Sequence, residues 1–552
     1  MTLKSHWKLL TMTYLSVLNI CMNMNRCNKN KAFAFFHSQA SSLNTRAIGR
    51  GNVHKKKGAS FNYVANTNTR LYNTGTSGTI APKTASYHLK EEQLLQSTPL
   101  SLAPMMEYTD RHFRHMVRLI SSHTLLYTEM VAANAIVHER KDAKSRGADL
   151  LKVPPEGSLL ENDVAQDLDE FGYDMTYLRR FLGQGQGGRE PEGPSILQLG
   201  GSEPQQLEEA CGVLMDLTKR GYCDYTGVNL NCGCPSPKVA GKGCFGAALM
   251  DEKDLVKDLV TAMHNGCQGE LPITVKCRIG TDQNMPFTKL GYENIDEEKE
   301  YSNLCRFVET VASSGVVTDF QVHARIAVLS KNFSPSDNRK VPTLKYNFVR
   351  KLVEDYPELT FSLNGGVNTI VGAKEELDRC DGLKGVMIGR AWAANPWSFS
   401  MADDILYPEL DSNTNRCKNR LEVLQAFGRH ADAEELLWDP VKIRRFITKA
   451  ATPLFAGEPR GKKYRIALDE IGGMPKKLKK RGESLDGQPP ISELIMNAAL
   501  ENIGEDVLLR SPKESYENLY GGVGGGGDYD ADSSTTTRVI QDWQNKRKLE
   551  QV

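Results

Sequence analysis

Residues 228–245 read VNLNCGCPSPKVAGKGCF, and this stretch decides the fold. An apolar, β-type run ends at Asn231 and breaks into a turn that carries Cys232, Cys234 and two prolines. Glycines follow before the next helix-like segment. The pattern indicates a strand that ends in a functional loop, and in an α/β barrel such strand ends carry the chemistry. A structural turn around a buried thiol is the alternative, because free cysteine is among the most buried residue types.

Comparable apolar runs recur along the chain, and amphipathic stretches of helical length lie between most of them. We expect strands at residues 100–103, 125–129, 196–199, 227–231, 273–277, 320–323, 360–363 and 386–388. Eight alternating units favour an α/β fold, a (β/α)8 TIM barrel, over an open doubly wound sheet. No GxGxxG sequence follows any expected strand, which argues against a Rossmann fold.

The length of 552 residues predicts two or more domains. We expect the barrel at 98–395, with surface insertions at about 152–194 and 282–300. A smaller all-helical domain is expected at 396–508, where the strand pattern stops. Residues 509–552 contain GGVGGGGDYDADSSTTT and are predicted to be a disordered, low-complexity tail.

Residues 1–92 are predicted to be a disordered targeting region. The first 90 residues contain no acidic residue but thirteen lysines and arginines, a composition typical of organelle transit peptides. The modestly apolar run at 9–22 resembles a signal-peptide core that is too short and too polar to span a bilayer. A weak signal core before a basic stretch resembles the bipartite presequence of complex plastids. We therefore favour the plastid stroma, with the mitochondrion or cytoplasm as alternatives.

Charge and cysteine content exclude several classes of site. The formal net charge is +1, so bulk charge indicates no particular partner and a nucleic-acid surface requires local clustering. The 12 cysteines include no CxxC pair, which predicts neither a zinc site nor a disulfide framework. We expect no metal, and a reducing compartment.

Seven of the eight expected strands contain a polar or glycine-rich set at their end or are followed by one, and a barrel would bring these sets to one face. In chain order they are Pro104, Met105 and Met106; Gln198; Asn231 and Cys234; Lys276 and Arg278; His323 and Arg325; Asn364, Gly365 and Gly366; and Gly389 and Arg390. Glycine-rich turns after strands seven and eight commonly bind phosphate in this fold. We infer FMN as the ligand, with Lys276 beside the pyrimidine end of the flavin to stabilise its anionic reduced state.

A dense basic region occupies the predicted helical domain. It includes Arg444, Arg445 and Arg465 and continues into KKLKKR at 476–481. A solvated helix face is the ordinary explanation of such a charge run, and a nucleic-acid surface is the alternative.

In the motifs at these strand ends, the chain resembles the tRNA-dihydrouridine synthases. The motifs that carry the resemblance are APMMEYTDRHFR (103–114), LLYTEM (125–130), LQLGGS (197–202), NLNCGCPS (229–236), VKCRIG (275–280), VHAR (322–325), SLNGGV (362–367) and GVMIGRAWAANPW (385–397). TDRHFR, LLYTEM and LFAGEPRGKKYR (454–465) point to the A-type branch, the tRNA-dihydrouridine(20/20a) synthase-like enzymes. The resemblance implies an FMN-dependent, NADPH-consuming reductase of D-loop uridines in tRNA, with a flavin barrel followed by a helical tRNA-binding domain.

The resemblance also implies roles for individual residues. Hydride would pass from N5 of FMN to C6 of uracil while Cys234, which matches the catalytic cysteine of the family, protonates C5. A thiol holds its proton at neutral pH without special tuning. Asn231 would hold or align the uracil, and Cys232 is the competing thiol. The expected tRNA contacts are Arg278, Arg325, Lys331, Arg339, Arg444, Arg445 and Arg465.

Two other functions remain open from the sequence. A flavin barrel acting on free pyrimidines, like the dihydroorotate dehydrogenases, explains the barrel but not the basic helices. A non-catalytic tRNA-binding protein explains the basic helices but not the full set of strand-end residues. We expect tRNA as partner, no obligate protein partner, and no membrane association of the mature chain.

Overall fold

The computed structural model describes residues 80–138, 175–184, 192–235, 245–283, 287–288, 291–292, 296–330, 333–410, 416–485 and 487–520. The predicted presequence up to residue 79, most of the insertion at 152–194, Lys331 and the tail from residue 521 lie outside the described residues.

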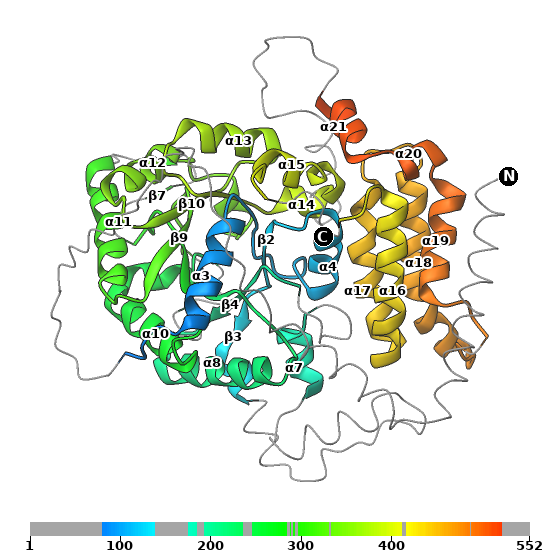
Figure 1. The fold of residues 1–552 in the computed structure, drawn as a ribbon, viewed down its shortest axis with the longest axis horizontal. Coiled ribbons are helices and arrows are strands. Elements are labelled where there is room, and N and C mark those ends of the chain that lie inside the picture. Colours follow the sequence, from blue (N-terminus) through cyan, green and yellow to red (C-terminus); the bar gives the residue numbers. More distant parts are fainter. Residues whose placement is uncertain are drawn as a thin grey trace, which may run out of the picture. The chain divides into compact units, whose positions relative to one another are not determined.

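A closed barrel of eight parallel strands forms one part of the described chain and lies on the left in Figure 1, beside a group of helices. Its strands are β1 (Leu100–Leu102), β2 (Leu125–Tyr127), β4 (Ser195–Gly200), β5 (Gly227–Cys232), β6 (Ile273–Arg278), β9 (Val317–His323), β10 (Thr360–Asn364) and β11 (Gly385–Ile388). The sheet closes because β1 pairs with both β2 and β11, and β2 also pairs with β4. The predicted TIM barrel is confirmed, and all eight predicted strands are present.

Successive side chains along each strand point alternately into the barrel and out toward the helices. On β5, Val228, Leu230 and Cys232 are fully buried in the apolar layer shared with the helices. Asn229 and Asn231 alternate with them and point into the barrel, where they meet side chains of other strands. The apolar run that predicted a strand therefore also places the polar residues on the inside.

Helices follow most of the strands and surround the barrel (Figure 1). They are α4 (Arg111–Ile120), α8 (Pro204–Lys219), α10 (Lys253–Gly266), α11 (Glu297–Ala312), α12 (Tyr346–Asp355), α13 (Ile370–Arg379) and α14 (Arg390–Ala394). Asp110, Asp296 and Thr369 begin α4, α11 and α13, and each side chain accepts a hydrogen bond from the backbone N–H three residues on. These caps explain why the helices begin where they do.

The folded part of the chain extends beyond both of its predicted ends. Helix α3 (Ala85–Ser97) overlaps the predicted presequence, but its Tyr87 and Leu94 are buried, so the fold begins before residue 92. Helix α21 (Pro512–Tyr520) overlaps the predicted tail. Its buried Ser515 accepts a hydrogen bond from Trp397 Nε1 at 2.9 Å, so the fold continues to residue 520.

Both predicted insertions contain parts of the fold. Helix α7 (Met175–Leu182) buries Leu178 and Leu182 in the core of the barrel. The second insertion contains a short hairpin of β7 (Phe287–Thr288) and β8 (Gly291–Tyr292). It ends before residue 300, because α11 begins at Glu297 and Glu300 is buried against Lys345 Nζ. The prediction that both insertions are surface excursions is therefore wrong at Leu178, Leu182 and Glu300, whose side chains are buried.

A helical region follows the barrel. Its main helices are α16 (Arg420–Leu437), α17 (Pro440–Ala451), α18 (Gly461–Arg481) and α19 (Ile491–Asn502), with the shorter α15 (Ala402–Leu406) and α20 (Glu505–Leu509) beside them. Helix α17 packs against α18 and α16 against α19, while α16 and α17 also contact α4 of the barrel. Among the described helices, none is both long and apolar enough to cross a membrane.

Buried polar side chains join α4 to α16. Arg111 binds both carboxylate oxygens of Glu434, and His112 Nδ1 lies 2.9 Å from His430 Nε2. Within the described residues, His112, His430 and Glu434 are the group whose potential metal-ligand atoms come within 4.8 Å of one another. Burial lowers the pKa of both histidines, and the Arg111 guanidinium already neutralises Glu434. The cluster is accordingly a hydrogen-bonded contact between the barrel and the helical region.

Candidate active site

A ladder of amide side chains crosses the barrel interior below the strand ends. Gln198 Nε2 donates to Asn229 Oδ1 at 2.8 Å, and Asn229 Nδ2 donates to Thr274 Oγ1 at 2.8 Å and to Gln321 Oε1 at 2.9 Å. Gln321 Nε2 in turn donates to Asp319 Oδ1 at 2.9 Å. These buried amides are hydrogen-bonded to one another, so the ladder fixes the orientation of Gln198 at the level of the predicted site.

The loop that carries Cys234 is fixed by Asn231. The Oδ1 atom of Asn231 accepts hydrogen bonds from the backbone N–H groups of Gly233 at 2.9 Å and Cys234 at 3.1 Å, while Nδ2 donates to Gln198 Oε1 at 3.2 Å. The Cys234 side chain is half-buried at the strand-end face. Cys232 is fully buried, and burial raises the pKa of its thiol well above the usual value. Of the two competing thiols, Cys234 is the accessible one.

Lys276 lies beside this loop and is held by the next strands. Its Nζ donates to Asn364 Oδ1 at 3.0 Å, and Asn364 Nδ2 donates to the backbone oxygen of Met387 at 2.7 Å. Burial, assisted by the nearby Arg278, lowers the pKa of Lys276 to about 8. An ammonium group with this pKa is still mainly charged at neutral pH, and an anion placed beside it would favour its charged form further.

His323 and the Gly365–Gly366 turn lie next to Lys276, because β9 pairs with β6 and β10 pairs with β9. Burial and the cations of Arg278 and Lys276 lower the pKa of His323 well below its usual value, so the ring is neutral. Gly365 and Gly366 have φ angles of 108° and 83°. A Cβ on Gly365 would lie 2.5 Å from His323 Cδ2, and one on Gly366 would lie 2.5 Å from Tyr346 Oη. Only glycine leaves this cradle open.

The β1 and β11 ends complete the face. Gly389 directly follows β11, and a Cβ there would lie 3.0 Å from Met105 Sδ, so the predicted Pro104–Met106 turn lies directly beside it. Met106 and Arg390 are exposed. The structure thus brings Pro104, Met105, Gln198, Cys234, Lys276, His323, Asn364, Gly365, Gly366, Gly389 and Arg390 to the carboxyl ends of the strands.

Two predicted tRNA contacts are buried and need correction. Arg278 is 3% exposed and donates to the backbone oxygens of Gly233 at 2.9 Å and Ile326 at 2.8 Å. Its guanidinium therefore fixes the Cys234 loop instead of facing a polynucleotide. Arg444 is also 3% exposed and makes a two-pronged ion pair with Glu435. Its charge is already neutralised inside the helical region.

The other predicted tRNA contacts remain at the surface. Arg339, Arg445 and Arg465 are exposed. Arg325 is half-buried and donates to the backbone oxygen of Pro342. Arg445 and Arg465 belong to a larger group of exposed cations on α17 and α18: Lys442, Lys449, Lys462, Lys463, Lys476, Lys477, Lys479, Lys480 and Arg481.

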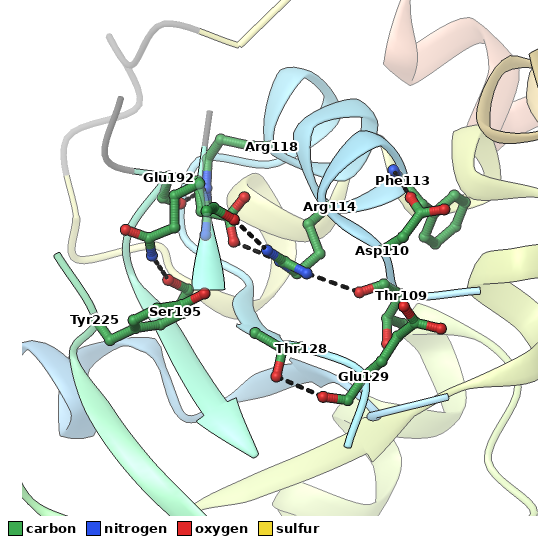
Figure 2. Close-up of polar contacts among 12 residues, drawn as sticks. Thr109, Asp110, Phe113, Arg114, Arg118, Thr128, Glu129, Glu192, Ser195 and Tyr225 are labelled. Atoms are coloured by element: carbon green, nitrogen blue, oxygen red, sulfur yellow. Dashed lines mark hydrogen bonds and ion pairs between the residues drawn. The ribbon is translucent and has the colours of Figure 1, made fainter. Parts of the chain in front are cut away.

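A buried ion pair supports the β1 and β2 ends (Figure 2). Figure 2 shows Arg114 extending from α4 to Glu192 and to the backbone oxygen of Thr109, which it reaches at 2.8 Å. Arg114 Nη2 also donates to the oxygen of Gly183, directly after α7, at 3.3 Å. Thr109 and Glu129 lie on the same side of this network. The ion pair fixes the turn after β1 and anchors α7 to the barrel.

Several of these residues were absent from the predicted set. Asn229 and Gln321 lie two residues before Asn231 and His323, which is the spacing that puts side chains on the same face of a strand. This two-residue repeat is present in the sequence and is sufficient to predict both positions. The Arg114–Glu192 pair could not be found in this way, because its partners are far apart in the chain and no local pattern joins them.

Asp319, at the base of the ladder, predicts a pH-dependent stability. Burial raises the pKa of its carboxyl group from 3.8 to about 7, although the hydrogen bond from Gln321 opposes this. The folded chain thus holds this proton more tightly than the unfolded chain, and stability is lost as pH rises from about 4 to about 7. Asp319→Asn keeps an acceptor for Gln321 and removes the ionisation. Its unfolding free energy relative to wild type should increase by roughly 3 kcal/mol between pH 4.5 and pH 8.

Denaturant unfolding at the two pH values measures this difference. Asp258→Asn, at an exposed position on α10, is the matched control and should show no such increase. Parallel pH profiles for Asp319→Asn and wild type would show that the buried carboxyl group carries no such cost.

These features define an α/β-barrel enzyme with its site where the parallel strands end. The chain belongs to the dihydrouridine synthase family, a family of oxidoreductases: the model of that family, "Dihydrouridine synthase (Dus)", matches residues 101–154 and 186–486. Three bacterial relatives bear the name tRNA-dihydrouridine(20/20a) synthase. The chain is 36% identical to that of Synechocystis, 34% to that of Yersinia pestis and 37% to that of Salmonella typhimurium. The matches cover 67%, 70% and 69% of this chain and 89%, 93% and 92% of the relatives.

Proposed function

We propose that this protein reduces uridine to 5,6-dihydrouridine in the D-loop of tRNA, with FMN as its bound cofactor and NADPH as its reductant. The single observation that carries the proposal is the meeting of the Cys234 loop, Lys276, His323 and the Gly365–Gly366 cradle on one face of the barrel. The names of the bacterial relatives support tRNA as the substrate.

The residues at the strand ends fit FMN. The open backbone of Gly365 and Gly366, beside the neutral His323 and near Arg390, suits a phosphate group. Lys276 provides a cation for the pyrimidine end of the isoalloxazine ring, and Gln198 provides an amide for its polar edge. FMN bound there would supply the hydride that reduces C6 of the uracil.

The chain's own residues supply the proton and its position. The Cys234 thiol gives a proton to C5 of the uracil from the opposite face. Asn231 and Arg278 act as positioning residues, because they hold the Gly233 and Cys234 backbone through bonds of 2.9 to 3.1 Å. The target uridine leaves its stacked position to reach this site, as bases do in other base-modifying enzymes.

The proposed tRNA contacts are the exposed cations of α17 and α18, which include Arg445 and Arg465, and two residues of the barrel, Arg325 and Arg339. Since phosphate contacts release counterions, binding should weaken steeply as salt is raised. The acid-free N-terminal sequence supports plastid import, and we infer that plastid tRNA is the substrate.

Mass-spectrometric mapping of tRNA tests the function and the compartment together. Loss of the protein should remove dihydrouridine from D-loop positions of plastid tRNAs and leave cytosolic tRNAs unchanged. In vitro, the purified chain with FMN and NADPH should form dihydrouridine in a tRNA transcript and leave free uracil unreduced. Reduction of free uracil at a comparable rate would favour an enzyme of free pyrimidines instead.

A further inference from the structure

An exposed aromatic ring lies within the basic surface of α17. Phe446 is 40% exposed, although most large apolar side chains of the described residues are buried. The exposed Lys442 and Lys449 lie on the same helix face, four residues before and three residues after Phe446, and Arg445, directly before it in the chain, is exposed as well. A large apolar side chain among cations is poorly suited to a protein core contact and well suited to a ligand that is both planar and anionic.

A second element brings a cation to this ring. The guanidinium carbon of Arg180, on α7, lies 5.9 Å from the centre of the Phe446 ring. Arg180 itself is exposed. The pair therefore joins α7 of the barrel to α17 of the helical region and presents a flat, positively charged surface, which we call the Arg180–Phe446 platform.

Helix α7 is firmly attached to the barrel, so the platform has a fixed position. The hydroxyl group of Tyr225 donates to the backbone oxygen of Leu182 at 3.0 Å, and Arg114 donates to Gly183. Leu178 and Leu182 are buried. Helix α7 lies between the two stretches that match the family model, 101–154 and 186–486. The platform is thus built partly from a segment outside the matched residues.

The platform lies near the strand-end face of the barrel. Burial raises the pKa of Glu129, two residues after β2, whereas the N–H of Glu107 and the charges of Arg114, Lys449 and Arg180 lower it. Arg180 and Lys449 are thus both within electrostatic reach of one carboxylate at the strand ends. Lys449 Nζ also donates to the backbone oxygen of Glu107, after β1, and lies 5.0 Å from the centre of the Tyr108 ring.

We propose that the Arg180–Phe446 platform stacks against an unpaired tRNA base next to the target uridine, while Lys442 and Arg445 contact the neighbouring phosphates. This inference rests on the proposed function and adds a stacking site to it. Aromatic and guanidinium planes are the usual partners of unstacked RNA bases. A base held here would fix the polynucleotide beside the strand-end face and favour displacement of the adjacent uridine.

Substitutions of Phe446 separate stacking from packing and charge. Both Phe446→Ala and Phe446→Leu should weaken binding of a tRNA transcript to the full-length protein by about 5- to 150-fold. Phe446→Trp should retain wild-type affinity. The salt dependence of binding should stay unchanged in these variants, whereas Arg445→Gln should lower its logarithmic slope by about one.

Leu89→Ala is the matched control for loss of an exposed apolar side chain. Leu89 is 65% exposed on α3, whose Lys90 pairs with Asp224 just before β5 and thus lies toward the opposite end of the barrel. This variant should bind tRNA like wild type. In transcripts with 2-aminopurine at single D-loop purines, wild-type protein should quench the fluorescence at one position and Phe446→Leu should not.

Wild-type tRNA affinity in Phe446→Leu would contradict the proposed stacking, because leucine keeps the apolar contact and removes the aromatic plane. Such a result would assign the exposed ring to a protein contact. Dihydrouridine formation by the wild-type protein is measured separately. If the wild-type protein forms dihydrouridine and Phe446→Leu binds normally, the platform alone fails; if the wild-type protein forms none, the proposed function fails.

Discussion

Replacement of Cys234 by alanine is expected to lower the rate of dihydrouridine formation by about 100- to 10,000-fold, the usual contribution of a positioned general acid. The thiol is half-buried at the strand ends, and the side chain of Asn231 and the guanidinium of Arg278 hold its loop. Flavin content should stay at the wild-type level, because the proposed cofactor contacts come from other strands. Single-turnover reduction of a tRNA transcript, with the product measured by mass spectrometry, gives the rate.

Cys232→Ala is the matched control. Cys232 is the last residue of β5, two residues before Cys234. Its side chain is fully buried in the apolar layer between the strands and the surrounding helices. Its replacement should destabilise the fold slightly and leave the rate per folded molecule within a few fold. A wild-type rate in Cys234→Ala, or a greater loss of rate in Cys232→Ala, would show that the proton comes from another group.

Gly365→Ala is expected to weaken FMN binding by about 5- to 150-fold. The φ angle of 108° makes any L-residue strained here, which lowers stability, whereas the added Cβ would lie 2.5 Å from His323 Cδ2 and displace that ring from the site at a cost of about 1–3 kcal/mol. Each 1.4 kcal/mol corresponds to a factor of ten in affinity. Fluorescence titration of the flavin-free protein with FMN measures the change.

Gly457→Ala separates backbone strain from intrusion into the site. Gly457 has a φ angle of 82°, but a Cβ there would meet nothing within 4 Å. Both variants should lose some stability, and only Gly365→Ala should lose FMN affinity. Equal FMN affinity in the two variants would mean that the cradle at the end of β10 does not hold the phosphate.

The barrel and most of its site could be predicted because both depend on local patterns. A buried parallel strand is a short apolar run, and the residue that follows it lies at the functional face. Lys276, His323 and Gly365 are predicted in this way, and the structure places all three at the carboxyl ends of the strands. The same period of two places Asn229 and Gln321 on the inner faces of β5 and β9.

Other features could not be predicted because they depend on tertiary contacts. Arg278 and Arg444 look like surface cations in the sequence, but the structure buries them against backbone oxygens and Glu435 respectively. From composition alone, the residues of α7 are predicted to lie in a surface insertion and those of α21 in a disordered tail. Their few apolar or hydroxyl side chains become informative only when the barrel supplies a partner, as Trp397 does for Ser515.

The most direct test of the account is reduction of a tRNA transcript by the purified protein supplied with NADPH, followed by flavin release and mass-spectrometric mapping. The expected results are release of bound FMN on denaturation and dihydrouridine at a D-loop position. A protein that binds no flavin and leaves every uridine intact would contradict it.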